Sequence, residues 1–417
     1  MRSFARGPAG PSGQPTTRAA GSEESRSCQG GPVPTHSPAR RLDGLGTTIF
    51  AEMSALALAT GSINLGQGFP DSDGPIEVAD AAVAAIRAGI NQYPPGPGIP
   101  DLRLAVTEHQ QRFYGLRLDP DTEVVVTTGA TEAIAAALLG LVDPGDEVIA
   151  LEPFYDSYTA GIAMAGGVRV PVTLRAPDFR LDVDRLRAAV TARTRLVLLN
   201  SPHNPTGTVL SEEELTAVAE LAVQRDLIVV TDEVYEHMTY GVPHRPLATF
   251  PGMAERTLTV SSAGKTFSFT GWKVGWACGP ARLVRAVLTA KQFLTFVSGA
   301  PFQPAVAVGL RLPDTYFTGL ADSLRGKRDR LVEGLRTVGL EVFVPQGTYF
   351  VSADVRSLGY DDGVTFCRDL PQRAGVVAIP HQVFYDDIEA GRPLVRFAFC
   401  KRDDVLDEAI DRLQRLL

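Results

Sequence analysis

The chain contains few cysteines for its length of 417 residues. Cys28, Cys278, Cys367 and Cys400 are far apart, and none has the CxxC spacing that is typical of zinc and dithiol redox sites. We therefore expect no metal site, and we interpret the cysteines as small buried apolar residues. So few cysteines are typical of a reducing compartment, which predicts a cytoplasmic protein.

Long apolar segments and an excess of basic residues are also missing. No apolar run approaches the roughly 20 residues that a helix needs to cross a bilayer, so we expect no membrane partner. The net charge of −8 and the pI of about 5.4 argue against nucleic acid as a partner. This acidic balance still allows a local basic pocket that binds a small anionic molecule.

The composition changes near residue 41. Residues 1–41 are rich in Gly, Pro, Ser, Thr and Arg and have no apolar periodicity, which predicts a disordered N-terminal extension. We favour this over a transit peptide, because the prolines and glycines would disrupt an amphipathic helix. We expect residues 42–80 to pack on a small domain, 81–310 to form a large α/β domain, and 311–417 to form that smaller α+β domain.

From residue 124 onward, short β-branched runs alternate with longer helical stretches. This alternation predicts an α/β domain with a mostly parallel sheet. Its expected strands are 124–128, 147–151, 168–174, 196–200, 227–231, 257–260 and 274–277. Beyond the sheet, further strands are expected at 341–344, 349–353, 376–379 and 395–399, followed by an amphipathic helix over 403–417.

Ligands of such sheets bind beyond the carboxyl ends of the strands, and polar motifs follow several of the expected strands here. The run 129–133 opens a helix with small residues, so its backbone N–H groups and the Thr131 hydroxyl could bind a phosphate. An ordinary helix start is the alternative. The run 200–207 contains prolines that stiffen a loop and could direct the Asn204 amide at a ligand oxygen, or it is simply a turn.

Asp232 ends an apolar strand, where a carboxylate is costly unless it is paired. A protonated pyridine nitrogen would be a suitable partner and would make the ring an electron sink. Tyr235 could then donate to a hydroxyl oxygen on the ring. The alternative is an ion pair with an arginine, which is more plausible for Glu233 than for Asp232.

Lys265 lies in a run of small and aromatic residues, 261–267, that has no other charge. A lysine becomes a nucleophile as the free amine, which requires that burial or nearby cations lower its pKa. Ser262 and Lys273 could complete the phosphate site. Arg396 lies in the apolar run 394–399 and is a candidate for binding a substrate carboxylate, with a structural ion pair as the alternative.

Several separated motifs occur in the order of one family. They are Asn64–Asp71, Asn91–Tyr93, Glu152–Asp156, Asn204–Gly207, Asp232–Tyr235, Ser262–Lys265 and Gly271–Lys273. From about residue 42 to the C-terminus the chain resembles the fold-type I, pyridoxal-phosphate-dependent class I aminotransferases. This resemblance implies an α/β fold with a mostly parallel seven-stranded sheet in the large domain, the smaller α+β domain, and pyridoxal 5'-phosphate as cofactor.

The resemblance also implies a role for each matching residue. Lys265 holds the cofactor and carries the proton, Asp232 pairs with the pyridine nitrogen, and Tyr235 and Asn204 hold the ring hydroxyl oxygen. Tyr155 stacks on the ring. The phosphate would be bound by Ala130, Thr131, Ser262 and Lys273, and by Tyr93 of a neighbouring subunit, so a homodimer with shared active sites is implied.

The substrate carboxylate would be bound by Gly68, Asn204 and Arg396, and Phe50 would also contact the substrate. Within the family the chain is similar to actinobacterial N-succinyldiaminopimelate aminotransferases of lysine biosynthesis, through the runs 49–54, 93–98 and 399–404. It is also similar to the kynurenine and glutamine aminotransferases, some of which cleave cysteine conjugates. Many kynurenine enzymes have tryptophan where this chain has Phe50, and some relatives have tyrosine where it has Thr131.

We therefore expect an enzyme that moves an amino group between an amino acid and a 2-oxo acid, with N-succinyldiaminopimelate and 2-oxoglutarate as the pair. The alternative is a kynurenine, glutamine or methionine aminotransferase with β-lyase activity. A third possibility, a regulator that fuses this fold to a DNA-binding domain, is disfavoured because the Gly- and Pro-rich run 1–41 does not supply a helical domain.

Overall fold

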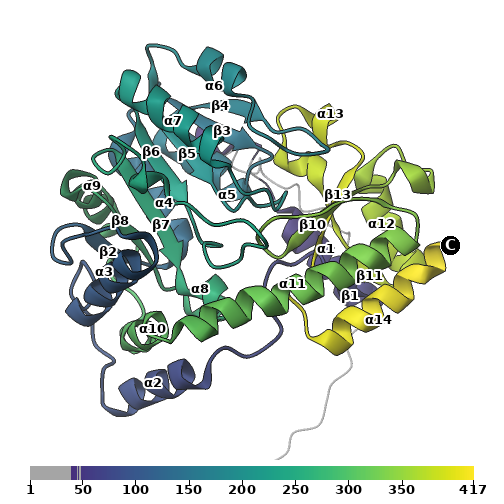
Figure 1. Ribbon diagram of the computed structural model, residues 1–417, viewed down its shortest axis with the longest axis horizontal. Helices are drawn as coiled ribbons and strands as arrows, with labels where there is room; N and C mark the ends of the chain where they lie inside the picture. The colour runs from purple at the N-terminus through teal and green to yellow at the C-terminus, as the bar shows by residue number, and fades with distance from the viewer. Residues whose placement is uncertain (1–38, 45, 47) are drawn as a thin grey trace, which may run out of the picture. The chain divides into compact units, whose positions relative to one another are not determined.

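The computed structural model describes residues 39–44, 46 and 48–417, and its largest element is a seven-stranded sheet (Figure 1). Apart from residues 39–41, the predicted N-terminal extension lies outside the described residues. The strand order is β2 (Val124–Thr127), β8 (Gly275–Cys278), β7 (Thr257–Ser262), β6 (Ile228–Asp232), β5 (Thr194–Asn200), β3 (Glu147–Glu152) and β4 (Val168–Thr173).

The sheet is parallel except at β8, which pairs antiparallel with both β2 and β7. The prediction of a mostly parallel seven-stranded sheet is therefore confirmed, and each strand lies within a few residues of its predicted range. Because β8 runs in the opposite direction, its amino end lies at the same sheet edge as the carboxyl ends of the other strands. Residues just before Gly275 therefore join the loops at that edge.

Helices cover both faces of this sheet, because alternate strand residues point to opposite sides. Val148 and Ala150 pack with α4 (Gly129–Leu141), α5 (Asp156–Ala165) and α9 (Ala281–Lys291). Ile149 and Leu151 pack on the other face with α6 (Val183–Ala189) and α7 (Glu212–Gln224). Near β2 and β8 this second face is covered by α3 (Pro100–Tyr114), α8 (Ala263–Thr266) and α10 (Phe302–Leu310), and α2 (Ile76–Arg87) packs on α10.

A four-stranded antiparallel sheet follows in the C-terminal part, in the order β12 (Ile379–Pro380), β13 (Leu394–Ala398), β10 (Phe350–Asp354) and β9 (Glu341–Phe343). The helices α11 (Asp314–Thr337), α12 (Gly363–Ala374) and α14 (Asp403–Leu413) lie beside it, and the short α13 (Ile388–Gly391) precedes β13 (Figure 1). The predicted final helix is correct, although its last turn, 414–416, is a 3-10 helix.

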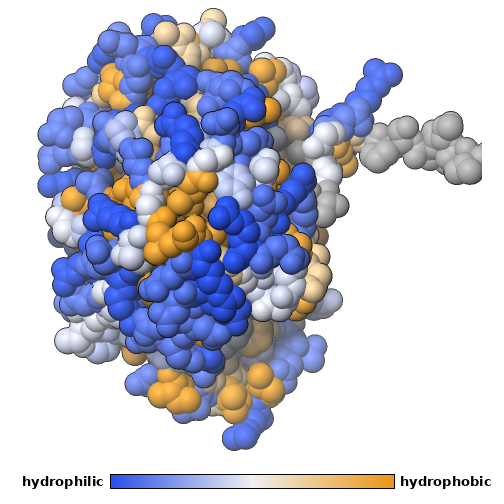
Figure 2. Space-filling view, turned by 90° about the vertical axis from the view of Figure 1, so that its right-hand side faces the viewer, coloured by the Kyte–Doolittle hydropathy of each residue, from blue (hydrophilic) through white to orange (hydrophobic). Residues whose placement is uncertain are grey.

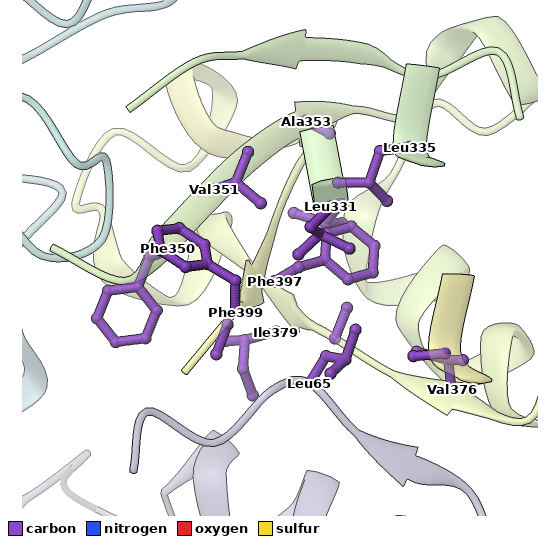
Figure 3. Packing of buried hydrophobic residues seen from close by; sticks show 14 of the residues in the cluster. Leu65, Leu331, Leu335, Phe350, Val351, Ala353, Val376, Ile379, Phe397 and Phe399 are labelled. Atoms are coloured by element: carbon purple, nitrogen blue, oxygen red, sulfur yellow. The ribbon is translucent and has the colours of Figure 1, made fainter. Parts of the chain in front are cut away.

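The segment before α2 packs on this second sheet region. The helix α1 (Ile49–Thr60) contacts α12, and β1 (Ile63–Asn64) pairs in parallel with β11 (Val376–Val377). Leu65 joins the same hydrophobic core as Phe350, Phe397 and Leu331 (Figure 3). Residues 41–417 form one compact unit, and the predicted boundaries within it, at residues 80 and 310, stay predictions.

The outer surface is largely polar where these elements face water. Figure 2 shows the side of the molecule at the right of Figure 1, where hydrophilic residues surround small groups of hydrophobic ones. On α14, Leu406, Ala409 and Leu413 are buried, while the acidic and basic residues between them face outward. Across the described residues, none of the helices combines the length and apolarity that crossing a membrane requires.

Leu331 provides a test of the second core. Its side chain in α11 is fully buried among aromatic and aliphatic residues (Figure 3). We expect Leu331→Ala to lower the free energy of unfolding by about 2–5 kcal/mol, because it removes buried methyl groups and leaves a cavity. The matched control is Leu58→Ala on α1, where the leucine is 86% exposed. Urea unfolding should show a lower midpoint for the first variant only, and equal midpoints would contradict this core assignment.

Candidate active site

A cavity of about 300 Å³ lies where the carboxyl ends of β2, β3, β5, β6 and β7 meet. This is the edge at which sheets of this kind bind ligands. Every sequence-predicted site residue except Tyr93 lines this cavity: Phe50, Gly68, Ala130, Thr131, Tyr155, Asn204, Asp232, Tyr235, Ser262, Lys265, Lys273 and Arg396. Loops that are distant in sequence thus converge on one small volume.

The Asp232 carboxylate lies in the cavity wall at the end of β6. Burial raises the pKa of Asp232 to about 6, while hydrogen bonds from the Tyr158 hydroxyl and the Val234 backbone N–H oppose the shift. These bonds measure 2.7 Å to Oδ2 and 3.3 Å to Oδ1. No ion pair to Asp232 exists among the described residues, so a cationic ligand group would complete its environment.

A chain of hydrogen bonds links Asp232 to Arg396. The Asn200 amide donates to the Asp232 carbonyl oxygen at 2.9 Å, and Asn200 Oδ1 accepts from the Asn204 backbone N–H at 2.7 Å. Asn204 Oδ1 in turn accepts from Arg396 at 2.9 Å. With its oxygen used in this way, Asn204 has its amide nitrogen left to donate into the cavity.

The start of α4 forms an electropositive corner of the cavity. Gly129 has φ +71°, and a Cβ built there would lie 3.2 Å from Lys273 Nζ, so the lysine amine approaches bare backbone. A Cβ on Gly275 would meet the Gly129 carbonyl carbon at 2.6 Å. The N-terminus of a helix of this length attracts anions, and Lys273 adds a full positive charge beside it.

Lys265 extends from α8 into the cavity, directly after β7. Its Nζ donates to the Gly68 carbonyl oxygen at 3.3 Å and lies 5.8 Å from the centre of the Tyr235 ring. Burial lowers the pKa of Lys265 to about 8, and the nearby cations Arg396 and Lys273 also lower it, while Asp232 acts in the opposite direction. The free amine that nucleophilic chemistry requires is therefore available near neutral pH.

Arg396 faces the cavity from β13, and its side chain is fully buried. One terminal nitrogen donates to Asn204 and the other donates to the Gly66 carbonyl oxygen at 2.8 Å. The alternative of a structural ion pair is not supported, since no carboxylate among the described residues pairs with it. Its Nε is buried and has no hydrogen-bond partner within the described chain, and the guanidinium as a whole lines the cavity, where a carboxylate could pair with it.

Aromatic side chains complete the walls. The Tyr155 ring is half-buried, and burial raises the pKa of Tyr155 to about 12, so its hydroxyl stays protonated. Tyr235 is buried, and burial raises its pKa as well. Phe50, in the first turn of α1, places its ring 5.2 Å from the Arg396 guanidinium and 6.5 Å from the Tyr155 ring.

Tyr93 is the predicted site residue that the structure does not bring to the cavity of its own chain. Its side chain is 81% exposed and packs edge-on against Phe296 at 5.4 Å. This position agrees with the expectation that Tyr93 serves a neighbouring subunit, which stays a prediction.

Sequence reasoning missed several residues that shape the site. Tyr158 bonds to Asp232, and its position one helical turn after Tyr155 at the start of α5 was the available signal. Gln67 lines the cavity, and its side-chain amide holds α1 in place by donating hydrogen bonds to the Phe50 carbonyl and to Ser54 Oγ. Phe350 lies against Arg396, and nothing local in the sequence distinguishes it from an ordinary core residue.

A second polar cluster lies outside the cavity and contains His109, Glu236 and His237, whose ligand atoms all lie within 4.8 Å of one another. The two histidine Nε2 atoms are 2.7 Å apart, so one ring nitrogen donates to the other. That bond uses the Nε2 lone pair of the accepting ring, and His109 Nδ1 has no hydrogen-bond partner among the described residues. Glu233, for which an arginine partner was considered, instead pairs with His244 at 2.8 Å.

Comparisons with known proteins agree with this geometry. Residues 60–413 match the family model described as aminotransferase class I and II. The probable N-succinyldiaminopimelate aminotransferase DapC of Mycobacterium tuberculosis is 57% identical over 388 residues, covering 90% of this chain and 98% of the relative. A kynurenine–oxoglutarate transaminase of Dictyostelium discoideum is 39% identical, covering 92% of this chain and 97% of that protein.

A solved structure shows the same fold. The N-succinyldiaminopimelate aminotransferase from Mycobacterium tuberculosis superposes with a TM-score of 0.89 at 57% identity, covering 91% of this chain and all of that one. The predicted family and fold class are thereby confirmed. From the convergence of the strand-end motifs on one cavity, and from these similarities over most of its length, the chain belongs to the class I and II aminotransferases.

Proposed function

We propose that this aminotransferase uses pyridoxal 5'-phosphate to move an amino group from an amino acid to a 2-oxo acid. One observation carries the proposal. A lysine amine with a lowered pKa and an arginine without a carboxylate partner face the same cavity, Lys265 bonded to the Gly68 carbonyl and Arg396 to the Gly66 carbonyl. The proposed nucleophile and the proposed carboxylate-binding residue thus donate hydrogen bonds to carbonyl oxygens two residues apart on one backbone segment.

The cavity fits the chemistry of this cofactor at both ends. Its phosphate would be bound at the start of α4 by the backbone at Ala130, by the hydroxyls of Thr131 and Ser262 and by the Lys273 amine, where Gly129 leaves room for an anion. Its ring nitrogen would face Asp232, a buried carboxylate that has only neutral donors in the protein.

The remaining contacts follow from the donors on the cavity walls. Tyr235 and the Asn204 amide would donate to the ring oxygen, and the Tyr155 ring would lie against the ring face. When bound, pyridoxal phosphate supplies an electron sink that stabilises negative charge at the substrate Cα. These residue roles are part of the proposal.

Different residues of the chain would then carry out different parts of the reaction. Arg396, with Asn204 and the Gly68 backbone, would hold the substrate carboxylate, which fixes the Cα–H bond relative to Lys265. Lys265 Nζ would take the proton from the substrate Cα and deliver it to the cofactor carbon that keeps the nitrogen, so that hydrolysis at Cα releases the 2-oxo acid. Asp232, as a carboxylate, would hold the positive charge of the ring nitrogen beside it. A second substrate bound in the same way would accept the amino group.

Lys265→Ala tests the proposed base. We expect its transamination rate to fall by about 10²–10⁴-fold or more, because the amine both anchors the cofactor and moves the proton. Lys327→Ala is the control, since Lys327 donates to the Lys401 carbonyl and does not line the cavity. A coupled assay for glutamate formation measures both. Activity in Lys265→Ala equal to that of the control would refute the role of Lys265.

For the substrates we propose N-succinyldiaminopimelate and 2-oxoglutarate, which would place the enzyme in lysine biosynthesis. The support is the 57% identity to the Mycobacterium tuberculosis relative, which exceeds the 39% identity to the kynurenine transaminase. Phe50 and Thr131, both at the cavity, also differ from the residues that many kynurenine enzymes and other relatives carry there.

A donor panel tests this choice. We expect kcat/KM for N-succinyldiaminopimelate, with 2-oxoglutarate as acceptor, to exceed the values for kynurenine, glutamine and methionine. Faster turnover of kynurenine would favour the alternative activity instead. Release of pyruvate and ammonia from a cysteine conjugate without any 2-oxo acid would identify a β-lyase, because elimination needs no acceptor.

We further propose a cytoplasmic homodimer whose subunits share active sites. Tyr93 and Phe296 form an exposed aromatic pair, and Phe293, three residues before Phe296 in the chain, is 83% exposed. Such a group of exposed aromatic residues is typical of a protein interface. A second copy placed on it would cover these rings and bring Tyr93 to the neighbouring cavity, where its hydroxyl could reach the phosphate.

Phe293→Glu tests the interface. A charge within this exposed aromatic group should convert the dimer to a monomer and weaken cofactor retention, because each site would lose the partner's Tyr93. Light scattering and the cofactor content after dialysis are the measurements. Val223→Glu, at another exposed apolar position, is the control. A Phe293→Glu protein that stays dimeric and retains its cofactor would contradict this interface.

A further inference from the structure

Tyr349 and Phe350 are consecutive residues at the start of β10, and both are buried. The Tyr349 hydroxyl donates to the Gly68 carbonyl oxygen at 2.5 Å. The same oxygen accepts from Lys265 Nζ at 3.3 Å. A carbonyl oxygen has two lone pairs, so the Gly68 oxygen can accept from Tyr349 and from the lysine amine at the same time.

This arrangement restricts where the Lys265 amine can go. Its Nζ lies 5.7 Å from the Tyr349 ring centre and 5.8 Å from that of Tyr235, and the two rings are perpendicular with centres 5.3 Å apart. The amine is thus placed by two aromatic rings and by one acceptor whose orientation Tyr349 fixes. A lysine side chain is otherwise flexible, so these contacts determine its average position.

Phe350 contacts the guanidinium of Arg396. The Arg396 guanidinium lies 3.9 Å from the centre of the Phe350 ring, closer than its 5.2 Å distance to Phe50 or its 5.6 Å distance to Phe384. Stacking on an aromatic face sets the plane of a guanidinium. The direction in which Arg396 presents its donors to a carboxylate therefore depends on the Phe350 ring.

Gly68 connects the two contacts. A Cβ built on Gly68 would lie 2.5 Å from Phe350 Cζ and 3.3 Å from Tyr349 Cε2, so this backbone passes directly against both rings. The same backbone segment supplies the Gly66 carbonyl to Arg396 and the Gly68 carbonyl to Lys265. Tyr349 and Phe350 thus contact the backbone segment to which both Lys265 and Arg396 donate hydrogen bonds.

We propose that Tyr349 and Phe350 are positioning residues: Tyr349 sets the Lys265 amine through the Gly68 carbonyl, and Phe350 sets the plane of the Arg396 guanidinium. The inference rests on the proposed function, in which the first group moves the Cα proton and the second binds the substrate carboxylate. Displacement of a reacting group by about 1 Å can cost about 10²-fold in rate. The two residues should therefore affect different kinetic parameters.

Tyr349→Phe should lower kcat by roughly ten- to a hundredfold with little change in KM, because the proton transfer is misaligned while carboxylate binding is kept. The kinetic isotope effect with a Cα-deuterated donor should increase as this step becomes rate-limiting. The pH titration of the visible absorption of the resting holoenzyme should also shift. Tyr385→Phe is the matched control, a buried tyrosine whose hydroxyl donates to the Leu174 carbonyl.

Phe350→Leu should mainly raise KM for the amino donor, because the guanidinium loses the ring that fixes its plane. Phe366→Leu is its control, a buried phenylalanine of the same core that does not line the cavity. If Phe350→Leu does not fold, Phe350→Met keeps a similar volume without a ring face and replaces it. Thermal unfolding midpoints of all variants separate positioning from a general loss of stability.

Each part of the proposal can be refuted separately by these measurements. A Tyr349→Phe enzyme with the wild-type kcat, isotope effect and absorption titration would overturn the first part, as would an equal change in Tyr385→Phe. A KM change in Phe350→Leu no larger than in Phe366→Leu would overturn the second. If the wild-type holoenzyme transaminates no donor, the proposed function itself fails. A wild type that transaminates beside unaffected variants would refute the positioning role alone.

Discussion

The burial of the Asp232 carboxylate at the end of β6 is the constraint on which the site depends. Burial is the largest cause of its raised pKa, about 6 against an ordinary 3.8, and this difference corresponds to about 3 kcal/mol against the charged form. Hydrogen bonds from Tyr158 and from a backbone N–H, and the positive charge of Lys265, compensate only in part. A fold that keeps a carboxylate in this environment is suited to a cationic ligand group, and the other cavity residues surround the place where that group would lie.

The geometry also depends on two distant parts of the chain meeting at one segment. The 66–68 backbone leads from β1 to the cavity and receives hydrogen bonds from Lys265 of the large sheet region, and from Tyr349 and Arg396 of the small one. Both sheet regions thus fix the same few peptide groups. A change in how they pack would move the amine and the guanidinium relative to each other, which connects the packing of the fold with the chemistry of the site.

The strands of the large sheet could be predicted from the sequence, because β-branched runs such as 124–127 and 228–231 are buried on both faces and bounded by turn residues. The antiparallel direction of β8 could not, since it depends on pairing with strands far away in the sequence. The site roles of Asp232, Asn204 and Lys265 could be predicted from the sequence, because each residue lies just after a predicted strand. Phe50 and Gly68 came from the family resemblance, and Tyr349 and Phe350 were recognised only from their contacts with Gly68 and Arg396.

The central claim is that Lys265, of all the lysines in the chain, holds the cofactor. Reduction of the purified holoenzyme with borohydride, followed by peptide mass spectrometry, tests it most directly, because reduction makes the lysine–cofactor link stable to digestion. The chain's lysines are Lys265, Lys273, Lys291, Lys327 and Lys401, so fragmentation of the labelled peptide can assign the modified lysine among five. We expect the cofactor mass on the peptide that contains Lys265. Its presence on another lysine, or on none, would contradict this account.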